Sequence, residues 1–153
     1  MHPHPKGRSF KFPVGGLLKI KGVVGKDDLH KPKQLDTNGE PCLLVIKNGN
    51  TTKVTLGRGT NLESVVRTIG EYDKEETSRE YAIYPYSRED GPFSAPGDSG
   101  SIVVDRQGRI VGLLTGGAGM TDATDVTYIT PYYWLDKRIK NAFPDSYLYP
   151  MVD

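Results

Sequence analysis

Residues 97–100 read Gly-Asp-Ser-Gly, and this stretch is the strongest candidate for chemistry in the sequence. A serine hydroxyl is a weak nucleophile that needs a base to take its proton and hydrogen-bond donors for the oxyanion that forms. Glycine on both sides lets the backbone turn so that amide N–H groups converge beside the hydroxyl. We therefore expect Ser99 to be a nucleophile, with the amides of Gly97 and Ser99 as its oxyanion hole and Asp98 supporting the loop.

The nucleophile elbow of α/β-hydrolases, G-x-S-x-G, does not fit this loop, because Ser101 stands where the second glycine belongs. The residues that follow, SIVVD at 101–105, also favour a strand, whereas an elbow leads into a helix. The loop is therefore expected to sit in a β-rich domain.

Strand patterns fill the chain from Cys42 onward. Short apolar or β-branched runs alternate with turn residues, and Asn48-Gly49-Asn50 predicts a hairpin. We expect strands at 42–47, 51–58, 61–69, 79–86, 101–105, 109–115 and 124–130, with an acidic turn at 71–78. Thr130 as a cap, Pro131 at the first helical position and apolar residues at helical spacing predict one helix at about 131–143. This pattern predicts an all-β barrel or sandwich with a C-terminal helix.

The first 41 residues differ from the rest in charge. Residues 1–35 carry eight Lys or Arg and two Asp, whereas residues 36–153 carry twelve Lys or Arg and seventeen Asp or Glu. We expect a basic arm and linker-like segment over 1–41, with an edge strand at 17–24 and a loop at 25–41, before a domain at 42–153. The basic arm is either solvated or bound to an anionic partner.

Bulk composition excludes several classes of protein. The formal net charge is +1, which argues against general nucleic-acid or membrane binding. Cys42 is the one cysteine, so no internal disulfide forms and no second thiol is present to bind a metal. No signal-peptide pattern is visible and no run approaches the ~20 apolar residues that span a bilayer. We expect a cytoplasmic location, no cofactor and no metal site.

The Gly-Asp-Ser-Gly loop and the order of elements around it resemble the C-terminal barrel of the chymotrypsin-like (trypsin-like) serine proteases over roughly residues 42–143. Upstream, KNGNTT at 47–52 followed by VTLG at 54–57 resembles the hairpin that opens that barrel. The segments FSAPGDSGS and VTYITP are similar to those of uncharacterised fungal trypsin-like proteins. The resemblance implies a six-stranded antiparallel Greek-key β-barrel with a C-terminal α-helix.

By this resemblance Ser99 forms an acyl intermediate, and the oxyanion loop is Gly97, Asp98 and Ser99. Strand 125–130 would line the substrate pocket together with Phe93, Ser94, Leu114, Thr115 and Gly116. Phe93 stands six residues before the nucleophile, where trypsin-type enzymes place an acid, so an apolar or small polar side chain is the expected preference. Asp98 matches the residue that pairs with a new N-terminal amine in activated zymogens; accepting backbone hydrogen bonds is its alternative role.

The family takes its catalytic His and Asp from a first barrel. This sequence holds only His2, His4 and His30, all ahead of the barrel pattern. We expect none of them within about 3.5 Å of the Ser99 hydroxyl, the reach of a general base. Two functions stay open. One is a serine endopeptidase half-domain that acts on a peptide or protein, with His and Asp on a missing N-terminal barrel or a partner chain. The other is an inactive barrel that binds peptides or proteins.

Overall fold

The computed structural model describes residues 15, 18–36, 38–69, 75–87, 89–118 and 126–148. The elements of this part of the chain are, in order, α1 (Lys26–His30), β1 (Gln34–Leu35), β2 (Pro41–Gly49), β3 (Lys53–Ile69), β4 (Glu75–Pro85), β5 (Ile102–Asp105), β6 (Ile110–Ala118), β7 (Val126–Pro131) and α2 (Tyr132–Ala142).

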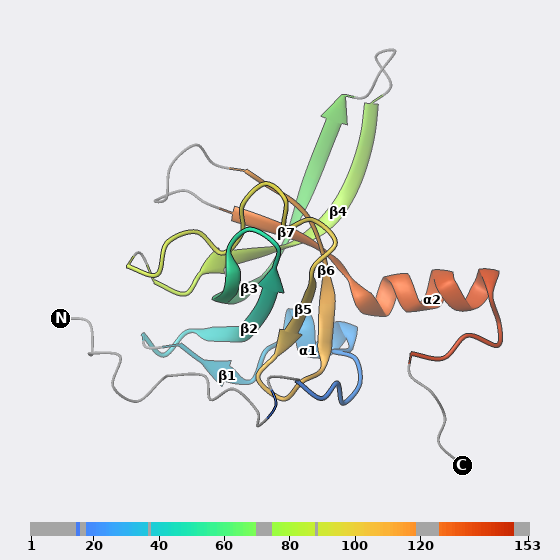
Figure 1. The fold of residues 1–153 in the computed structure, drawn as a ribbon, viewed down its shortest axis with the longest axis horizontal. Coiled ribbons are helices and arrows are strands. Elements are labelled where there is room, and N and C mark those ends of the chain that lie inside the picture. The colour runs from blue at the N-terminus through green and yellow to red at the C-terminus, as the bar shows by residue number, and fades with distance from the viewer. Residues whose placement is uncertain are drawn as a thin grey trace.

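Six of the strands close into an antiparallel barrel (Figure 1). The strand order is β1-β2-β3-β4-β7-β6-β5, and β2 also pairs with β5 to close the ring. β5, β6 and β7 are consecutive neighbours, whereas β4 lies beside β7 and reaches β5 through the long connection 86–101, which is a Greek-key arrangement. The expected fold class, a six-stranded Greek-key barrel with a terminal helix, is confirmed. The long connection carries the Gly-Asp-Ser-Gly loop.

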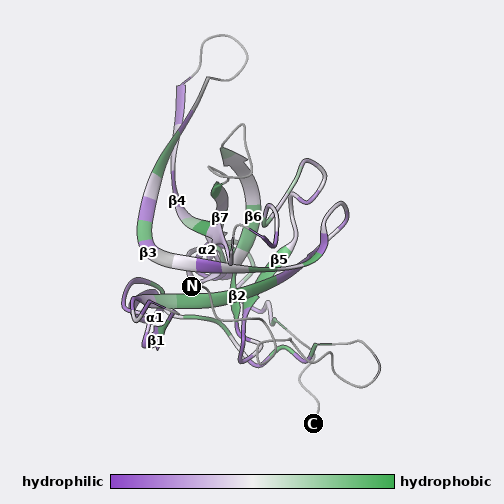
Figure 2. Ribbon diagram, turned by 90° about the vertical axis from the view of Figure 1, so that its left-hand side faces the viewer, coloured by the Kyte–Doolittle hydropathy of each residue, from purple (hydrophilic) through white to green (hydrophobic). Residues whose placement is uncertain are grey.

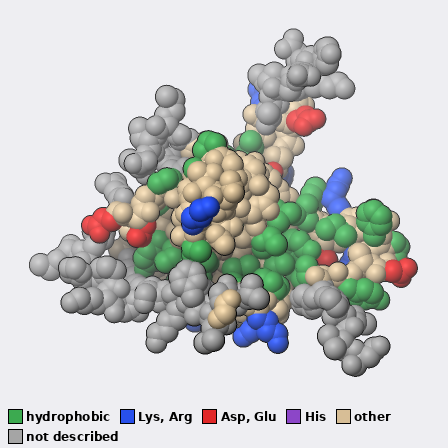
Figure 3. Space-filling view, in the orientation of Figure 1, with side chains coloured by type: hydrophobic (Ala, Val, Ile, Leu, Met, Phe, Trp, Pro, Cys, Tyr) green, Lys and Arg blue, Asp and Glu red, His purple; other side chains and the backbone are tan. Residues whose placement is uncertain are grey.

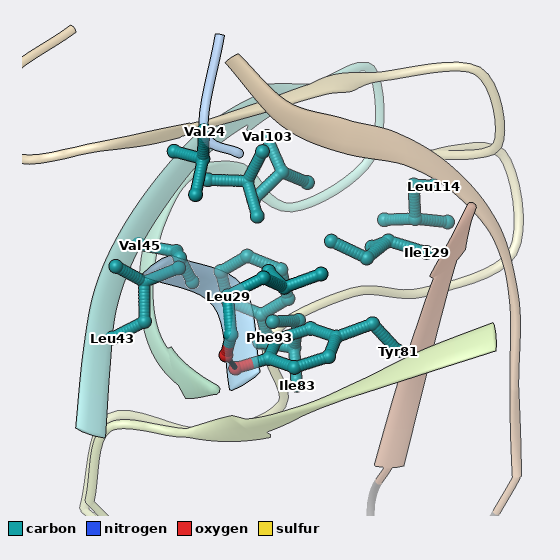
Figure 4. Packing of buried hydrophobic residues seen from close by; sticks show 11 residues of the cluster. Val24, Leu29, Leu43, Val45, Tyr81, Ile83, Phe93, Val103, Leu114 and Ile129 are labelled. Carbon is teal, nitrogen blue, oxygen red and sulfur yellow. Dashed lines mark hydrogen bonds between the residues drawn. The ribbon is translucent and has the colours of Figure 1, made fainter. Parts of the chain in front are cut away.

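Apolar side chains from the strands fill the barrel (Figure 4). β2 is largely apolar along its length (Figure 2), since Leu43 and Val45 face the interior while Ile46 packs outside with Val104 and Ile110. Burial of each large apolar side chain contributes about 1.5–3 kcal/mol, so this cluster is the main stabilising term. Its members are Val24, Leu29, Leu43, Val45, Tyr81, Ile83, Phe93, Val103, Val111, Leu114 and Ile129.

The segment ahead of β2 is part of the barrel body. Residues 17–24, expected as an edge strand, form a single parallel bridge, Val23 to Ile110, within the described residues. Residues 25–41, expected as a linker-like loop, include α1 and β1, and Leu29 of α1 is fully buried in the core. Arg109 fixes α1 by donating to Asp28 at 2.8 Å while it also donates to the buried Asp105 at 2.8 Å. The basic arm at 1–14 lies outside the described residues.

β3 is one long strand where the sequence predicts two. Its register against β4 shifts between Gly59 and Glu63, and Asn61 takes a positive φ of 53° there, so the strand bends without ending. A Cβ at Gly59 would lie 2.6 Å from the Tyr81 hydroxyl oxygen, and only glycine fits. The bulge therefore joins the two predicted strands.

Beyond the bulge, β3 and β4 form a two-stranded ribbon that projects from the barrel (Figures 1 and 2). The pairing runs from Glu63 opposite Tyr81 to Ile69 opposite Glu75. Residues 75–78, expected in an acidic turn, belong to β4, and 71–74 lie outside the described residues. The β4 half of the ribbon, residues 75–80, is entirely polar, and residues 75–79 are exposed, so apolar alternation gave no signal for this part of the strand.

Replacing Tyr81 with phenylalanine is expected to lower the free energy of unfolding by about 1–3 kcal/mol. The Tyr81 hydroxyl donates to the Leu29 carbonyl at 3.1 Å and accepts from the Asn61 amide at 3.2 Å, so both backbone groups would lose a partner. Burial raises the pKa of Tyr81 to about 12, which keeps the donor proton in place. Urea denaturation measures the change, with the exposed Tyr147→Phe as control. Equal midpoints for Tyr81→Phe and the wild type would contradict it.

α2 starts one residue later than the capping pattern predicts. Pro131 still belongs to β7 and precedes the helix, and the Thr130 hydroxyl donates to Glu80 at 2.9 Å and makes no cap hydrogen bond. The end near residue 143 is as expected. Tyr133 packs on the core, whereas no side chain of α2 is fully buried, and the helix extends away from the barrel (Figure 1).

Candidate active site

The loop that carries Ser99 turns tightly before β5. The Asp98 amide donates to the Ala95 carbonyl at 3.0 Å and closes a four-residue turn. Pro96 and Gly97 are its central residues, and Gly97 has a φ of +99°, which a type II turn requires at that position. A Cβ on Gly97 would also meet the Thr51 hydroxyl oxygen at 2.5 Å. Glycine is thus required at 97 for both backbone angle and space.

Ser99 and two amides remain available beside this turn. Ser99 is exposed. Its own N–H and that of Gly97 donate to no acceptor within the part of the chain that the structure describes. Amides left without an intrachain acceptor are what an oxyanion hole needs. The structure therefore places Ser99, the predicted nucleophile, next to the predicted donor amides, whereas the Asp98 amide donates to the Ala95 carbonyl within the turn.

The other end of the loop is fixed to β6. The Gly100 amide donates to the Leu114 carbonyl at 2.7 Å, and the Leu114 amide donates to the Ser101 carbonyl at 3.0 Å. The Ser101 hydroxyl and amide both donate to the Asp98 carbonyl, at 2.6 and 3.1 Å. Gly100 has a φ of +84°, so the backbone reverses directly after Ser99. These bonds hold Ser99 between two anchored residues, Asp98 and Gly100.

The Asp98 side chain is fully buried beneath the loop and points at the β2–β3 hairpin. One carboxylate oxygen accepts from the amides of Thr51 and Thr52 at 2.7 and 3.3 Å. The other accepts from Lys47 Nζ at 3.0 Å, the Thr52 hydroxyl at 2.6 Å and the Ala95 amide at 3.2 Å. Asp98 thus tethers the loop that carries Ser99 to a hairpin 46–51 residues earlier in the sequence.

The partners of Asp98 explain the segment KNGNTT at 47–52, a K-x-G-x-T-T pattern. Lys47 supplies an ammonium, and Thr51 and Thr52 supply amides and hydroxyls, the Thr51 hydroxyl donating to the Pro96 carbonyl at 2.8 Å. A Cβ on Gly49 would lie 2.5 Å from Asp98 Cγ, so the glycine makes room for the carboxylate. Sequence reasoning did not assign these residues to the site. A buried-strand lysine inside an otherwise apolar run, CLLVIK, was the available signal.

Opposing effects set the charge of Asp98. Burial favours the neutral acid and acts to raise the pKa of Asp98, whereas hydrogen bonds from Thr52, Thr51, Lys47 and Ala95 favour the carboxylate. The bonds prevail and hold the pKa of Asp98 well below its usual range. Asp98 is therefore an anion in the folded chain.

The folded protein is expected to lose stability in acid through Asp98. A carboxyl group whose pKa is lowered by folding stabilises the fold above its unfolded pKa, near 3.9, and this contribution falls as the pH drops below that value. The loss approaches about 1.4 kcal/mol per pH unit. Asp98→Asn removes this dependence, so urea unfolding from pH 6 to pH 2 should give a shallower pH slope for the variant. Asp36, whose pKa is also lowered, is common to both proteins and cancels in the comparison. Parallel slopes would contradict the prediction.

The residues expected around the substrate pocket lie in two environments. Phe93 is fully buried in the core, with Lys47 Nζ 5.7 Å from its ring centre, and Leu114 is also buried. The Ser94 hydroxyl is hydrogen bonded to that of Thr127 on β7 at 2.7 Å, and Thr115 on β6 is exposed. Half-buried Gly116 follows. The structure therefore brings the loop together with β6 and β7, with Phe93 underneath and not on the surface.

His30 lies at a different part of the barrel. Its ring packs edge-on against Tyr81, and its Nε2 is 3.2 Å from a carboxylate oxygen of Glu63, without the alignment of a hydrogen bond. No hydrogen bond or ion pair joins a histidine to Ser99 among the described residues, and His2 and His4 lie outside them. None of the helices described is long and apolar enough to cross a membrane.

Two solved structures are similar to this chain. A Mycobacterium tuberculosis protease in its active form matches with a TM-score of 0.51 and 16% identity over 86% of this chain and 50% of its own. Cellulomonas bogoriensis chymotrypsin matches with a TM-score of 0.46 and 23% identity over 67% of this chain and 47% of its own. The barrel shares its fold with one half of the Mycobacterium tuberculosis protease.

The chain spans about half the length of each of these two proteins. No family model matches the sequence. No curated protein matches it either.

Proposed function

We propose that this chain is a serine endopeptidase half-domain, which supplies the nucleophile and the oxyanion hole for hydrolysis of a peptide or protein. The observation that carries the proposal is the exposed Ser99 beside two amides that have no acceptor among the described residues, in a loop tethered through Asp98. The catalytic His and Asp would come from a first barrel or from a partner chain. The match to only 50% of the Mycobacterium tuberculosis protease supports this division.

The proposed reaction has two steps. The Ser99 oxygen attacks the peptide carbonyl carbon while the external histidine takes its proton, and the amides of Gly97 and Ser99 hold the oxyanion. The C–N bond then breaks, and the amine leaves with the proton that the histidine returns. Water, deprotonated by the same histidine, then attacks the acyl carbon; the bond from that carbon to the Ser99 oxygen breaks, the acid leaves, and the histidine returns the proton to Ser99.

The substrate side chain is proposed to be apolar or small and polar. The position that would hold an acid for Lys or Arg binding is Phe93, which is fully buried. The Ser94 and Thr127 hydroxyls are uncharged and already bonded to each other. We further propose a cytoplasmic setting and a fungal-type relationship, which rest on the single cysteine and on the FSAPGDSGS and VTYITP segments.

A binding module is the second candidate function. The specific observation in its favour is the apolar surface of α2, where Trp134, Ile139 and Phe143 are exposed. Hydrophobic side chains gather where α2 leaves the barrel (Figure 3). Exposed apolar groups of this kind mark surfaces that contact other proteins.

Labelling with a serine-reactive phosphonate separates the two functions. A half-domain enzyme should be modified at Ser99 when mixed with a barrel that carries His and Asp, and slowly on its own at high pH. Ser99→Ala should abolish labelling, whereas Ser78→Ala, an exposed serine on β4, should leave it unchanged. Peptide mapping locates the adduct. No adduct on Ser99 under either condition would leave the binding module as the function.

A further inference from the structure

We propose that two copies of this chain form a two-fold dimer in which α2 of one copy docks, through Arg138, on the outer face of the barrel around Glu80 of the other. The dimer goes beyond the proposed function, and its formation does not depend on whether Ser99 reacts. Two surfaces of the chain carry the proposal. One is an almost buried anion without a cation, and the other is a helix face whose one charge is a cation.

Glu80 is an almost buried carboxylate that no cation neutralises in the described part of the chain. Its exposed fraction is 7%. One carboxylate oxygen accepts from the Thr130 hydroxyl at 2.9 Å, and the other has no partner among the described residues. Withdrawing a carboxylate from water without an opposite charge is unfavourable. A cation supplied from outside the chain would offset that penalty.

Glu80 ends a row of side chains across the outer face of the barrel. Thr130 of β7 lies beside Glu80 of β4. Leu113 of β6 pairs with Thr130, and Ile102 of β5 pairs with Leu113. Each member of this Glu80 row has a strand neighbour in the core cluster, so alternation along the strands turns the row outward. Ile102 is 47% exposed and Leu113 is half-buried, so an apolar strip leads to the carboxylate.

α2 carries a face of complementary chemistry. Residues three and four apart share one side of a helix, and the side that contains Arg138 also holds Trp134, Leu135, Ile139 and Ala142. The Arg138 guanidinium lies 4.5 Å from the centre of the Trp134 ring and has no ion-pair partner among the described residues. Trp134 and Ile139 are 46% and 39% exposed. This Arg138 face therefore presents a single cation among apolar side chains, which is what the Glu80 row lacks.

The net charges of β4 and α2 favour contact between these two elements. β4 contains three glutamates and one arginine, whereas α2 contains three basic residues and one aspartate. Two α2 helices would repel each other, and so would two β4 strands, whereas α2 and β4 attract. A second copy of the chain therefore fits best with its helix against the strand.

The positions of the two surfaces in one copy suit a closed two-fold pair. Thr130 belongs to the Glu80 row, and α2 begins two residues later, at Tyr132, and projects away from the barrel (Figure 1). In a two-fold pair each contact occurs twice, so Arg138 of each copy would lie opposite Glu80 of the other. The dimer would also cover hydrophobic side chains that gather where α2 leaves the barrel (Figure 3).

Charge reversal tests the dimer, with sedimentation equilibrium of the full chain as the measurement. The wild type should dimerise reversibly as its concentration is raised. Arg138→Glu should weaken the dimer about 100-fold or more, because it places like charges together at both contacts. Lys137→Glu is the matched control: it makes the same charge change at an exposed position on another side of α2 and should weaken the dimer far less.

A mixture of two variants tests the pairing of the residues themselves. Glu80→Arg alone should be monomeric, whereas Glu80→Arg mixed with Arg138→Glu should form a heterodimer, because both contacts then join a cation to an anion. If Glu80→Arg does not fold, Glu80→Gln replaces it. Glu80→Gln should weaken the dimer and raise the urea midpoint of the dilute monomer, since the buried charge is gone.

Three results would overturn the proposal. The first is a wild type that stays monomeric, which would leave the Glu80 row to a partner other than a copy of this chain. The second is an Arg138→Glu protein that dimerises as well as the Lys137→Glu control. The third is a mixture of the folded Glu80→Arg and Arg138→Glu variants that stays monomeric or, where Glu80→Gln is used, a Glu80→Gln protein that dimerises as the wild type does.

Discussion

Replacing Lys47 with methionine is expected to lower the free energy of unfolding by about 3–5 kcal/mol, the cost of breaking a buried ion pair by removing one partner. Methionine keeps most of the apolar stem but cannot donate to Asp98, which stays buried as an anion. The Thr52 hydroxyl and the Lys53 carbonyl lose a donor as well. Urea unfolding at pH 7, followed by circular dichroism, measures the change.

Two further variants test whether the loss of stability comes from the Lys47–Asp98 ion pair. Lys53→Met changes the charge by the same amount on the exposed side of the hairpin and should cost no more than about 0.5 kcal/mol. Lys47→Met combined with Asp98→Leu should be less destabilised than the sum of the two single variants, because no unpaired charge remains. Additive single effects, or a Lys47→Met protein as stable as the wild type, would show that the pair does not act as a unit.

Replacing Gly49 with alanine is expected to cost about 3 kcal/mol, from overpacking together with broken hydrogen bonds. The added Cβ would lie 2.5 Å from Asp98 Cγ and 2.9 Å from Lys47 Nζ, inside van der Waals contact with both. The carboxylate has to move, and its bonds to Thr51 and Lys47 break. Thermal and urea unfolding measure the loss, and phosphonate labelling at Ser99 should fall with it.

Gly116→Ala is the matched control for Gly49→Ala. A Cβ at Gly116 meets nothing within 4 Å, so its effect on stability should stay within about 0.5 kcal/mol. If Gly49→Ala were as stable as Gly116→Ala, Asp98 would have to sit farther from the hairpin than described. That outcome would remove the physical reason for glycine in the K-x-G-x-T-T pattern.

Elements built from local contacts were predictable from the sequence. The hairpin at Asn48-Gly49-Asn50 joins β2 to β3, and the terminal helix runs over 132–142 against an expected 131–143. The turn next to Ser99 could also be predicted from the sequence, because Pro96, Gly97 and Gly100 lie within five residues and favour the backbone angles that the turn needs. Each of these depends on residues a few positions apart.

Features that depend on distant residues were not predictable. β3 continues through its bulge because Tyr81, about twenty residues later, fills the space beside Gly59. Residues 26–30 form a helix whose Leu29 is buried in the core and whose Asp28 accepts from Arg109, some eighty residues away. The role of Lys47 was not predicted either, because its partner Asp98 lies 51 residues later in the sequence. Sequence spacing alone does not indicate which distant residues will be in contact.

Closure of the barrel also sets the order in which this protein can mature during synthesis. Lys47 pairs across the last seam with Val103 of β5 and, through its side chain, with Asp98. When only residues up to about 90 have left the ribosome, the β2–β3 hairpin is present but Asp98 and β5 are not. The Lys47 side chain therefore cannot yet be buried. The seam and the loop then form together, since contacts between distant residues come late in folding. A chain whose barrel is still open therefore lacks the contacts that order the loop around Ser99. An ordered Ser99 loop thus indicates that the barrel has closed.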